Sequence, residues 1–266
     1  MKTFPTVTRA AFVFLAFATV AEAKIKTQAV EYQDGDTVLE GYLAYDDAKS
    51  FARKPGVLIV HAWKGITAYE KSRAEQTARL GYVAFVADIY GKGIRPQTAD
   101  EARKLAGQYK GDLPLLRKRV NLGLEELKKQ RGVAPNRIGA MGYCFGGTTV
   151  LELARSGADL SGVVSFHGGL ATKNTDESKN IKGKVLVLTG ADDPGVPPSQ
   201  VAAFEEEMRK GGVDYQVVSY GGAVHSFTDP GAGNDNSTGS AYNEKADKRS
   251  FEMMKDFFAE ALTPKQ

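Results

Sequence analysis

Short apolar runs alternate with longer amphipathic segments along most of this chain of 266 residues, and that order constrains the fold more than any other feature. A short continuous apolar run is typical of a strand buried on both faces of a sheet. The runs lie at 57–61, 82–87, 137–141, 162–166, 185–188 and 215–219, and the amphipathic segments at 68–80, 98–109, 113–130, 148–156, 198–210 and 246–260. This alternation predicts an α/β fold with a mostly parallel sheet, helices on both faces and right-handed crossovers.

Residues before the first run follow a different period. The segments 27–32 and 37–44 alternate on either side of Gln33-Asp34-Gly35-Asp36, a turn signal, so we expect an N-terminal antiparallel hairpin at one edge of the sheet. One hydrophobic core stops growing at about 250 to 300 residues, and no linker or repeat divides the chain, so we predict a single domain over residues 24–266. The polar stretch Asp229–Asn243 predicts a long loop, which is often functional or mobile.

The first 23 residues resemble a secretory signal peptide. Lys2 and Arg9 precede a largely apolar run at 10–20, and Ala21-Glu22-Ala23 places small residues at the two positions that a signal peptidase reads. We therefore expect cleavage after Ala23 and a periplasmic or secreted mature protein. A retained membrane anchor is the alternative, although the run is too short to cross a bilayer core of about 30 Å as a helix.

The composition excludes several classes of function. The net charge is +3 and 25% of the residues are charged, without a basic run, which argues against nucleic-acid binding. After signal cleavage we expect no contact with a membrane. The single cysteine, Cys144, excludes an internal disulfide and a zinc site of several thiolates, and we expect no metal and no cofactor. An unpaired thiol in an exported protein suggests chemical use; a buried cysteine that acts as a small hydrophobe is the alternative.

Ligands of open α/β sheets bind beyond the carboxyl ends of the strands, so the residues that follow each run are the candidates for a site. Gly142-Tyr143-Cys144-Phe145-Gly146 follows one run, precedes a helix and has the spacing of a G-x-S-x-G nucleophile elbow with Cys in place of Ser. The glycines allow a sharp turn from strand to helix. The helix N-terminus and a nearby imidazole lower a thiol pKa, so the pattern predicts that Cys144 is a nucleophile.

The other two members of a triad follow from chain order, which in elbow hydrolases is nucleophile, acid, histidine. Of the three histidines, only His225 comes late enough; His61 and His167 are expected to pack or to form supporting hydrogen bonds. The acid is expected in the loop after the run at 185–188, where Asp192 and Asp193 are both candidates. It accepts a hydrogen bond from the imidazole and fixes its tautomer.

At these three segments the chain resembles the dienelactone hydrolase family of α/β-hydrolases, over nearly all of the expected mature chain. Gly-Tyr-Cys-Phe-Gly-Gly at 142–147 is similar to the family's elbow, 190–197 to its acid loop and 225–227 to its histidine segment. The resemblance favours Asp193 over Asp192. It implies an α/β-hydrolase fold, a Cys-His-Asp triad that hydrolyses an ester, and an oxyanion hole made by the backbone amides of Phe145 and Trp63.

Three positions depart from that family's pattern. Ala62 stands where the family commonly has a glutamate that interacts with the resting cysteine, so thiol activation is expected to differ. Lys92 and Asp229 stand where dienelactone-cleaving members use two arginines to hold a substrate carboxylate, so dienelactone itself is not the expected substrate. We assign Lys92, Asp229 and Tyr143 to the substrate pocket, with Lys64 or Arg95 as alternative cations.

The sequence therefore predicts an exported hydrolase that cleaves a small carboxylic ester or lactone through a thioester on Cys144. Two alternatives stay open. One is a thioesterase or peptidase that uses the same triad, and the other is a non-catalytic binding protein that retained the fold. A monomer or small homo-oligomer is expected.

Overall fold

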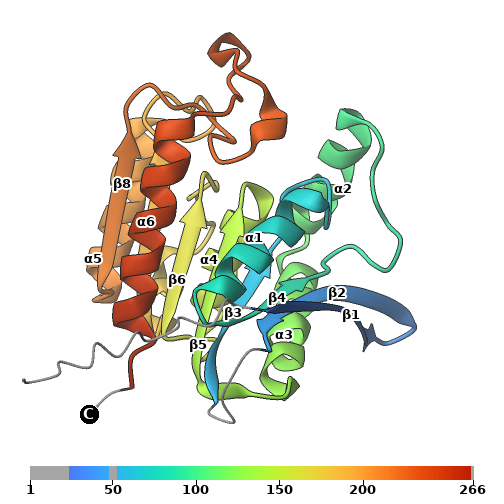
Figure 1. Ribbon diagram of the computed structural model, residues 1–266. Coiled ribbons are helices and arrows are strands. Elements are labelled where there is room, and N and C mark those ends of the chain that lie inside the picture. The colour runs from blue at the N-terminus through green and yellow to red at the C-terminus, as the bar shows by residue number, and fades with distance from the viewer. Residues whose placement is uncertain (1–23, 48–52, 265–266) are drawn as a thin grey trace, which may run out of the picture.

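The computed structural model describes residues 24–47 and 53–264. The expected signal peptide, at 1–23, lies outside the described residues. Eight strands in this part of the chain form one sheet in the order β1-β2-β4-β3-β5-β6-β7-β8 (Figure 1). The strands are β1 (Ile25–Asp34), β2 (Thr37–Asp46), β3 (Lys54–Val60), β4 (Val83–Ala87), β5 (Val133–Tyr143), β6 (Gly162–Phe166), β7 (Lys184–Gly190) and β8 (Tyr215–Tyr220).

The pairing confirms the predicted α/β architecture. β1 pairs with β2, and β2 with β4, in antiparallel fashion, and every other neighbouring pair is parallel. The predicted hairpin is therefore present at one edge, with β1 as the outer strand. Gly35 at its turn has a φ of 56°, which glycine adopts without strain.

Helices cover both faces of the sheet, as the alternating sequence predicts (Figure 1). They are α1 (Ala68–Arg79), α2 (Ala99–Gly111), α3 (Leu113–Lys129), α4 (Phe145–Arg155), α5 (Pro198–Gly211) and α6 (Glu244–Ala261), with short 3₁₀ turns η1 (Thr175–Asn180), η2 (Pro230–Ala232) and η3 (Asn236–Thr238). In β3, Val57 and Ile59 belong to the core cluster that α1 and α6 complete, whereas Leu58 and Val60 belong to the cluster that α3, α4 and α5 complete. The uninterrupted apolar run thus supplies both cores.

The start of α4 differs from the sequence expectation by three residues. The amphipathic pattern begins at Thr148, but the helix begins at Phe145, directly after Cys144. Gly146 and Gly147 therefore lie in the first turn of the helix, where their low helix propensity hid them from a pattern search. The cysteine occupies the N-cap position of α4, as an elbow requires.

None of the helices in the described ranges combines the length and the apolar character that crossing a bilayer requires. The parallel strands β3 to β8 have their carboxyl ends on the same side of the sheet, and the loops that follow these ends carry the candidate residues. The 229–243 segment, predicted as a loop, contains η2 and η3 and lies above α6 (Figure 1).

Candidate active site

The nucleophile elbow forms because two glycines let three backbone segments approach closely. A Cβ atom on Gly142 would lie 2.1 Å from the carbonyl oxygen of Gly146, and a Cβ on Gly146 would lie 2.1 Å from the carbonyl oxygen of Val60. Either contact is far too short for any other residue. Cys144 between them has φ 54° and ψ −113°, a strained conformation for a side-chain-bearing residue. The turn presents the partly exposed thiol at the N-terminus of α4.

The structure brings Cys144, His225 and Asp193 together. The Sγ atom of Cys144 lies 3.0 Å from Nε2 of His225, and Nδ1 of the same ring lies 2.8 Å from Oδ2 of Asp193. Because a carboxylate can only accept, Nδ1 carries a proton and donates a hydrogen bond to Asp193. The other carboxylate oxygen, Oδ1, accepts the Gly195 amide at 2.7 Å, and Asp193 is buried, so its orientation is fixed.

The second aspartate of the acid loop has a different position. Asp192 is exposed, and its Oδ2 accepts the amide of Gly222 at 3.0 Å. It therefore stabilises the turn after β8 and makes no contact with the imidazole. Of the two candidates that chain order leaves open, the one beside His225 is Asp193.

The pKa shifts of Cys144 and His225 are those of an ion pair between the two side chains. Burial alone raises the pKa of the Cys144 thiol, but the hydrogen bond and charge of His225 outweigh burial, helped by Lys110 and the Phe145 amide, so the pKa is lowered overall. Burial lowers the pKa of His225, but its hydrogen bonds to Asp193 and Cys144 dominate and raise it to about 10. Both directions favour a thiolate facing an imidazolium at neutral pH.

The segment after β8 holds His225 in place, a role that its polar composition did not reveal. The amide of His225 donates to the Gly239 carbonyl at 3.2 Å, and the amide of Ala241 donates to the His225 carbonyl at 3.0 Å. Ser226, the next residue, has a φ of 58°. The far end of the 229–243 loop is thus a backbone support for the imidazole, which explains why a long polar loop is ordered here.

Two backbone amides were predicted to form an oxyanion hole. The Phe145 amide faces the Cys144 sulfur and contributes to its low pKa. Trp63 lies in the loop after β3, and within the described ranges its amide has no hydrogen-bond acceptor, while its carbonyl accepts the Tyr90 hydroxyl at 3.0 Å. Neither predicted donor is taken up by a backbone carbonyl in the described ranges, so both can bind a ligand. Their role in an oxyanion hole stays a prediction.

A buried carboxylate that the sequence analysis missed shapes the Trp63 loop. Glu70, 1% exposed, accepts the amide of Ala62 at 3.1 Å through Oε1 and the amide of Thr67 at 2.8 Å through Oε2. Thr67 and Glu70 form the capping box of α1, a signal that Thr-x-x-Glu before a helix carries in the sequence. The residue at position 62 contributes an amide to this carboxylate instead of an acidic side chain to the cysteine.

The three residues assigned to the substrate pocket are not brought together. Lys92 pairs with Glu31 and lies 3.8 Å from Glu40, so its charge is directed to the β1–β2 hairpin. Tyr143 is 1% exposed and stacks on Phe166 inside the core, with a ring centroid distance of 4.7 Å. Neither side chain is free to face a substrate in this arrangement.

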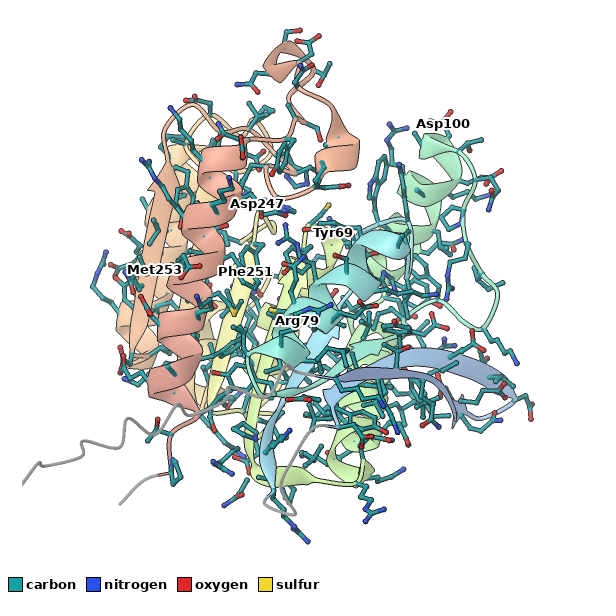
Figure 2. All side chains as sticks on the ribbon, in the orientation of Figure 1. Tyr69, Arg79, Asp100, Asp247, Phe251 and Met253 are labelled. Carbon is teal, nitrogen blue, oxygen red and sulfur yellow. The ribbon has the colours of Figure 1, made fainter. Side chains whose placement is uncertain are left out.

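Asp229 lines a cavity of about 500 Å³ between α1 and α6. Figure 2 shows Tyr69 on α1 and Asp247 and Phe251 on α6 on facing sides of that space. The carboxylate of Asp229 accepts the Gly231 amide at 2.8 Å, which starts η2. Asp229 therefore belongs to a groove that Cys144, His225 and Asp193 do not line.

The two other histidines form supporting hydrogen bonds. His61, fully buried at the end of β3, lies 2.7 Å from the Ala62 carbonyl through Nδ1 and accepts the Ile89 amide at 3.2 Å through Nε2. It ties the loops after β3 and β4 together.

Within the described part of the chain, no three His, Cys, Asp or Glu side chains are grouped so that they could hold a metal ion.

Solved structures and curated sequences resemble this chain over most of its length. A dienelactone hydrolase-like promiscuous phosphotriesterase from metagenomic libraries is 39% identical, with a TM-score of 0.84 over 89% of this chain and 98% of its own. A probable 2-oxo-3-(5-oxofuran-2-ylidene)propanoate lactonase of Bradyrhizobium sp is 29% identical over 76% of this chain and 85% of its own. A putative carboxymethylenebutenolidase of Aquifex aeolicus is 26% identical over 75% and 86%.

A family-wide sequence description gives the same result as these individual relatives. The model of the dienelactone hydrolase family matches residues 39–262, which is nearly the whole of the sheet and all of the helices around it. Together with the shared fold and the relatives named carboxymethylenebutenolidase, this match places the chain in the dienelactone hydrolase family, as a hydrolase that acts on esters or lactones.

Proposed function

We propose that this protein hydrolyses a small, uncharged carboxylic ester or lactone through Cys144, His225 and Asp193. The observation that carries the proposal is the continuous chain of contacts from the Cys144 sulfur through the imidazole to a buried carboxylate, at 3.0 and 2.8 Å. A nucleophile, a base and a group that orients the base are then in hydrogen-bond reach of one another, which covalent catalysis requires.

The reaction has two steps. The Cys144 thiolate attacks the carbonyl carbon, and as the tetrahedral intermediate collapses, the His225 imidazolium gives its proton to the departing alkoxide, leaving a thioester on the sulfur. Neutral His225 then takes a proton from water, the resulting hydroxide attacks the thioester, and the acid product and thiolate are released. The amides of Phe145 and Trp63 are proposed to stabilise the oxyanion in both steps.

The charges around the site favour an uncharged substrate. Lys92 is already paired with two carboxylates of the hairpin, and Asp229 brings a negative charge to the segment that carries His225, four residues earlier. A paired guanidinium fork, which holds carboxylates well, has no counterpart at these positions. An uncharged phosphotriester is a second candidate substrate, since the relative at 39% identity is described as a promiscuous phosphotriesterase. A thioester or peptide substrate would use the same triad.

The test is hydrolysis of 4-nitrophenyl acetate by the protein and by Cys144→Ala, with mass spectrometry of the acid-quenched reaction. Turnover that is lost in Cys144→Ala, together with an acetyl group on the Cys144 peptide of the parent protein, supports the proposal. Unchanged hydrolysis by Cys144→Ala, or an acyl group on another residue, refutes it. Parallel assays with a phosphotriester and an acyl thioester rank the alternative substrates.

A further inference from the structure

One imidazole outside the proposed triad contacts both the nucleophile and the segment that carries the base. His167 follows β6 and is 2% exposed. Its Nδ1 lies 3.1 Å from the backbone nitrogen of Cys144, and its Nε2 lies 2.7 Å from Oγ1 of Thr228, three residues after His225. The ring also packs edge-to-face on the His225 ring, with centroids 5.3 Å apart. A single side chain therefore links the elbow to the histidine loop.

These contacts fix the protonation state of His167. The Cys144 N–H can only donate, and it is shared between the Phe166 carbonyl at 3.0 Å and Nδ1 of His167 at 3.1 Å. Nδ1 is therefore the unprotonated acceptor, and Nε2 carries the proton and donates a hydrogen bond to Thr228. Burial, followed by the nearby positive charges of His225 and Arg73, holds the pKa of His167 well below its ordinary value. The ring therefore stays neutral, and a second proton on Nδ1 would place two donors face to face at Cys144.

Thr228 is itself held by two side chains of α1, one of which is bonded to α6. Its Oγ1 lies 2.5 Å from the Tyr69 hydroxyl, and its carbonyl accepts a hydrogen bond from Arg73 at 2.6 Å. Arg73 also donates to Asp247 of α6 at 2.5 Å. The contact that His167 makes with the histidine loop thus ends on a rigid point, and a rigid end point is what a clamp needs in order to fix a distance.

We propose that His167 is a positioning residue, which clamps the Cys144 backbone to the loop of His225 so that sulfur and imidazole stay at hydrogen-bond distance. The proposal rests on the proposed function, because it assigns His167 to the same reaction. His167 has a φ of 40°, a conformation that costs free energy for a side-chain-bearing residue. Its ring contacts the Cys144 amide, the Thr228 hydroxyl and the rings of His225, Phe227 and Tyr143, so it acts through Cys144 and His225 and touches no reacting atom.

The test measures the pH dependence of Cys144 alkylation by iodoacetamide, which reports the thiolate directly because the chain has one cysteine. His167→Phe removes both hydrogen bonds of the ring and leaves the Cys144 amide bonded to the Phe166 carbonyl alone. Thr228→Val removes the hydrogen bond between Nε2 and Thr228, and Thr228→Ser retains it. We expect the alkylation midpoint to rise by about one pH unit in the first two variants. Ester kcat/KM should fall about 10- to 100-fold, mainly through kcat, the usual size of effect for misplaced catalytic groups. Thr228→Ser should restore both values.

Thr77→Val is the matched control, since Thr77 is also a fully buried threonine, and its hydroxyl donates to the Arg73 carbonyl at 2.7 Å. It should lower the melting temperature without moving the midpoint. Folded His167→Phe and Thr228→Val proteins with the parent midpoint would overturn the proposal; if His167→Phe does not fold, the Thr228 pair decides. A parent protein that hydrolyses no ester would refute the proposed function alone, since the alkylation midpoints still decide the role of His167.

Discussion

Replacing Asp193 by Asn tests whether the buried carboxylate supports the imidazolium. The substitution preserves the shape of the side chain and removes its charge, while the Asn amide group can also point a donor at Nδ1 of His225. Asp192→Asn is the matched control, because this neighbouring aspartate is exposed and its side chain accepts the Gly222 amide instead of the imidazole. We expect Asp193→Asn to lose nearly all activity and Asp192→Asn to change it less than about threefold, the usual range for a surface substitution.

The size of the effect follows from the site. The pKa of His225 is raised from 6.5 to about 10. At about 1.4 kcal/mol for each tenfold change, this corresponds to roughly 5 kcal/mol of net stabilisation of the imidazolium. Asp193 and the Cys144 sulfur provide it against the cost of burial. If about half comes from Asp193, its charge is worth about 2 to 3 kcal/mol, a factor of about 30 to 150 in rate, and the wrong tautomer of His225 adds to the loss. A fall in kcat/KM of at least 100-fold is therefore expected.

The assay is kcat/KM for 4-nitrophenyl acetate over a range of pH, with thermal melting as the check on folding. An Asp193→Asn protein that melts like its parent and keeps more than a tenth of its kcat/KM would refute the reasoning. A larger loss in Asp192→Asn than in Asp193→Asn would show that Asp192, and not Asp193, is the acid of the triad. Either result would leave the family assignment unchanged.

Three further outcomes are expected. For substrate charge, 4-nitrophenyl acetate should have a kcat/KM at least several-fold higher than the 4-nitrophenyl monoester of succinate, because placing the succinate carboxylate near Asp229 costs on the order of 1 kcal/mol. Asp229→Arg should shrink this preference, and a parent enzyme that prefers the anionic ester would contradict it. For pH, kcat/KM should fall on the alkaline side near the His225 pKa of about 10, because the imidazolium then loses the proton that the leaving group needs. It should also fall on the acid side once the thiolate of Cys144 is protonated. A rate that rises steadily through pH 10 would argue against the ion pair. For export, intact mass of the secreted protein should begin at Lys24, and Met1 on the exported soluble protein would sink the proposed cleavage after Ala23.

The fold was predictable because its strands are buried on both faces. Such strands leave uninterrupted apolar runs, and the predicted run at 162–166 coincides with β6 at both ends. The edge hairpin was equally accessible, since its alternation and its Asp-Gly turn are local signals. The error at the start of α4 has a local cause too, because Gly146 and Gly147 contradict helix propensity. Long-range contacts explain why glycine is required at both positions: a Cβ on Gly146 would meet Val60, and a Cβ on Gly147 would meet Ser165.

The candidate site was predictable only where chain order or spacing carried information. The order of nucleophile, acid and histidine identified Cys144 and His225, and the family pattern chose Asp193. The contacts of Lys92 with Glu31 and of His167 with Thr228 join segments that are 61 residues apart in each case, and no local pattern encodes which partner a side chain meets over such a distance. Glu70 is different, because its capping-box spacing with Thr67 is a local signal that the sequence carries.

The chain separation between the proposed nucleophile and base has a consequence for how the protein folds. Cys144 and His225 are 81 residues apart and meet only when β5, β6, β7 and β8 have aligned side by side in parallel. Parallel pairing of this kind closes large loops and is slow to form. During refolding from denaturant, helical circular dichroism should therefore recover before the rapid alkylation of Cys144 does. The reactivity of this one sulfur would then report when the C-terminal half of the sheet has assembled.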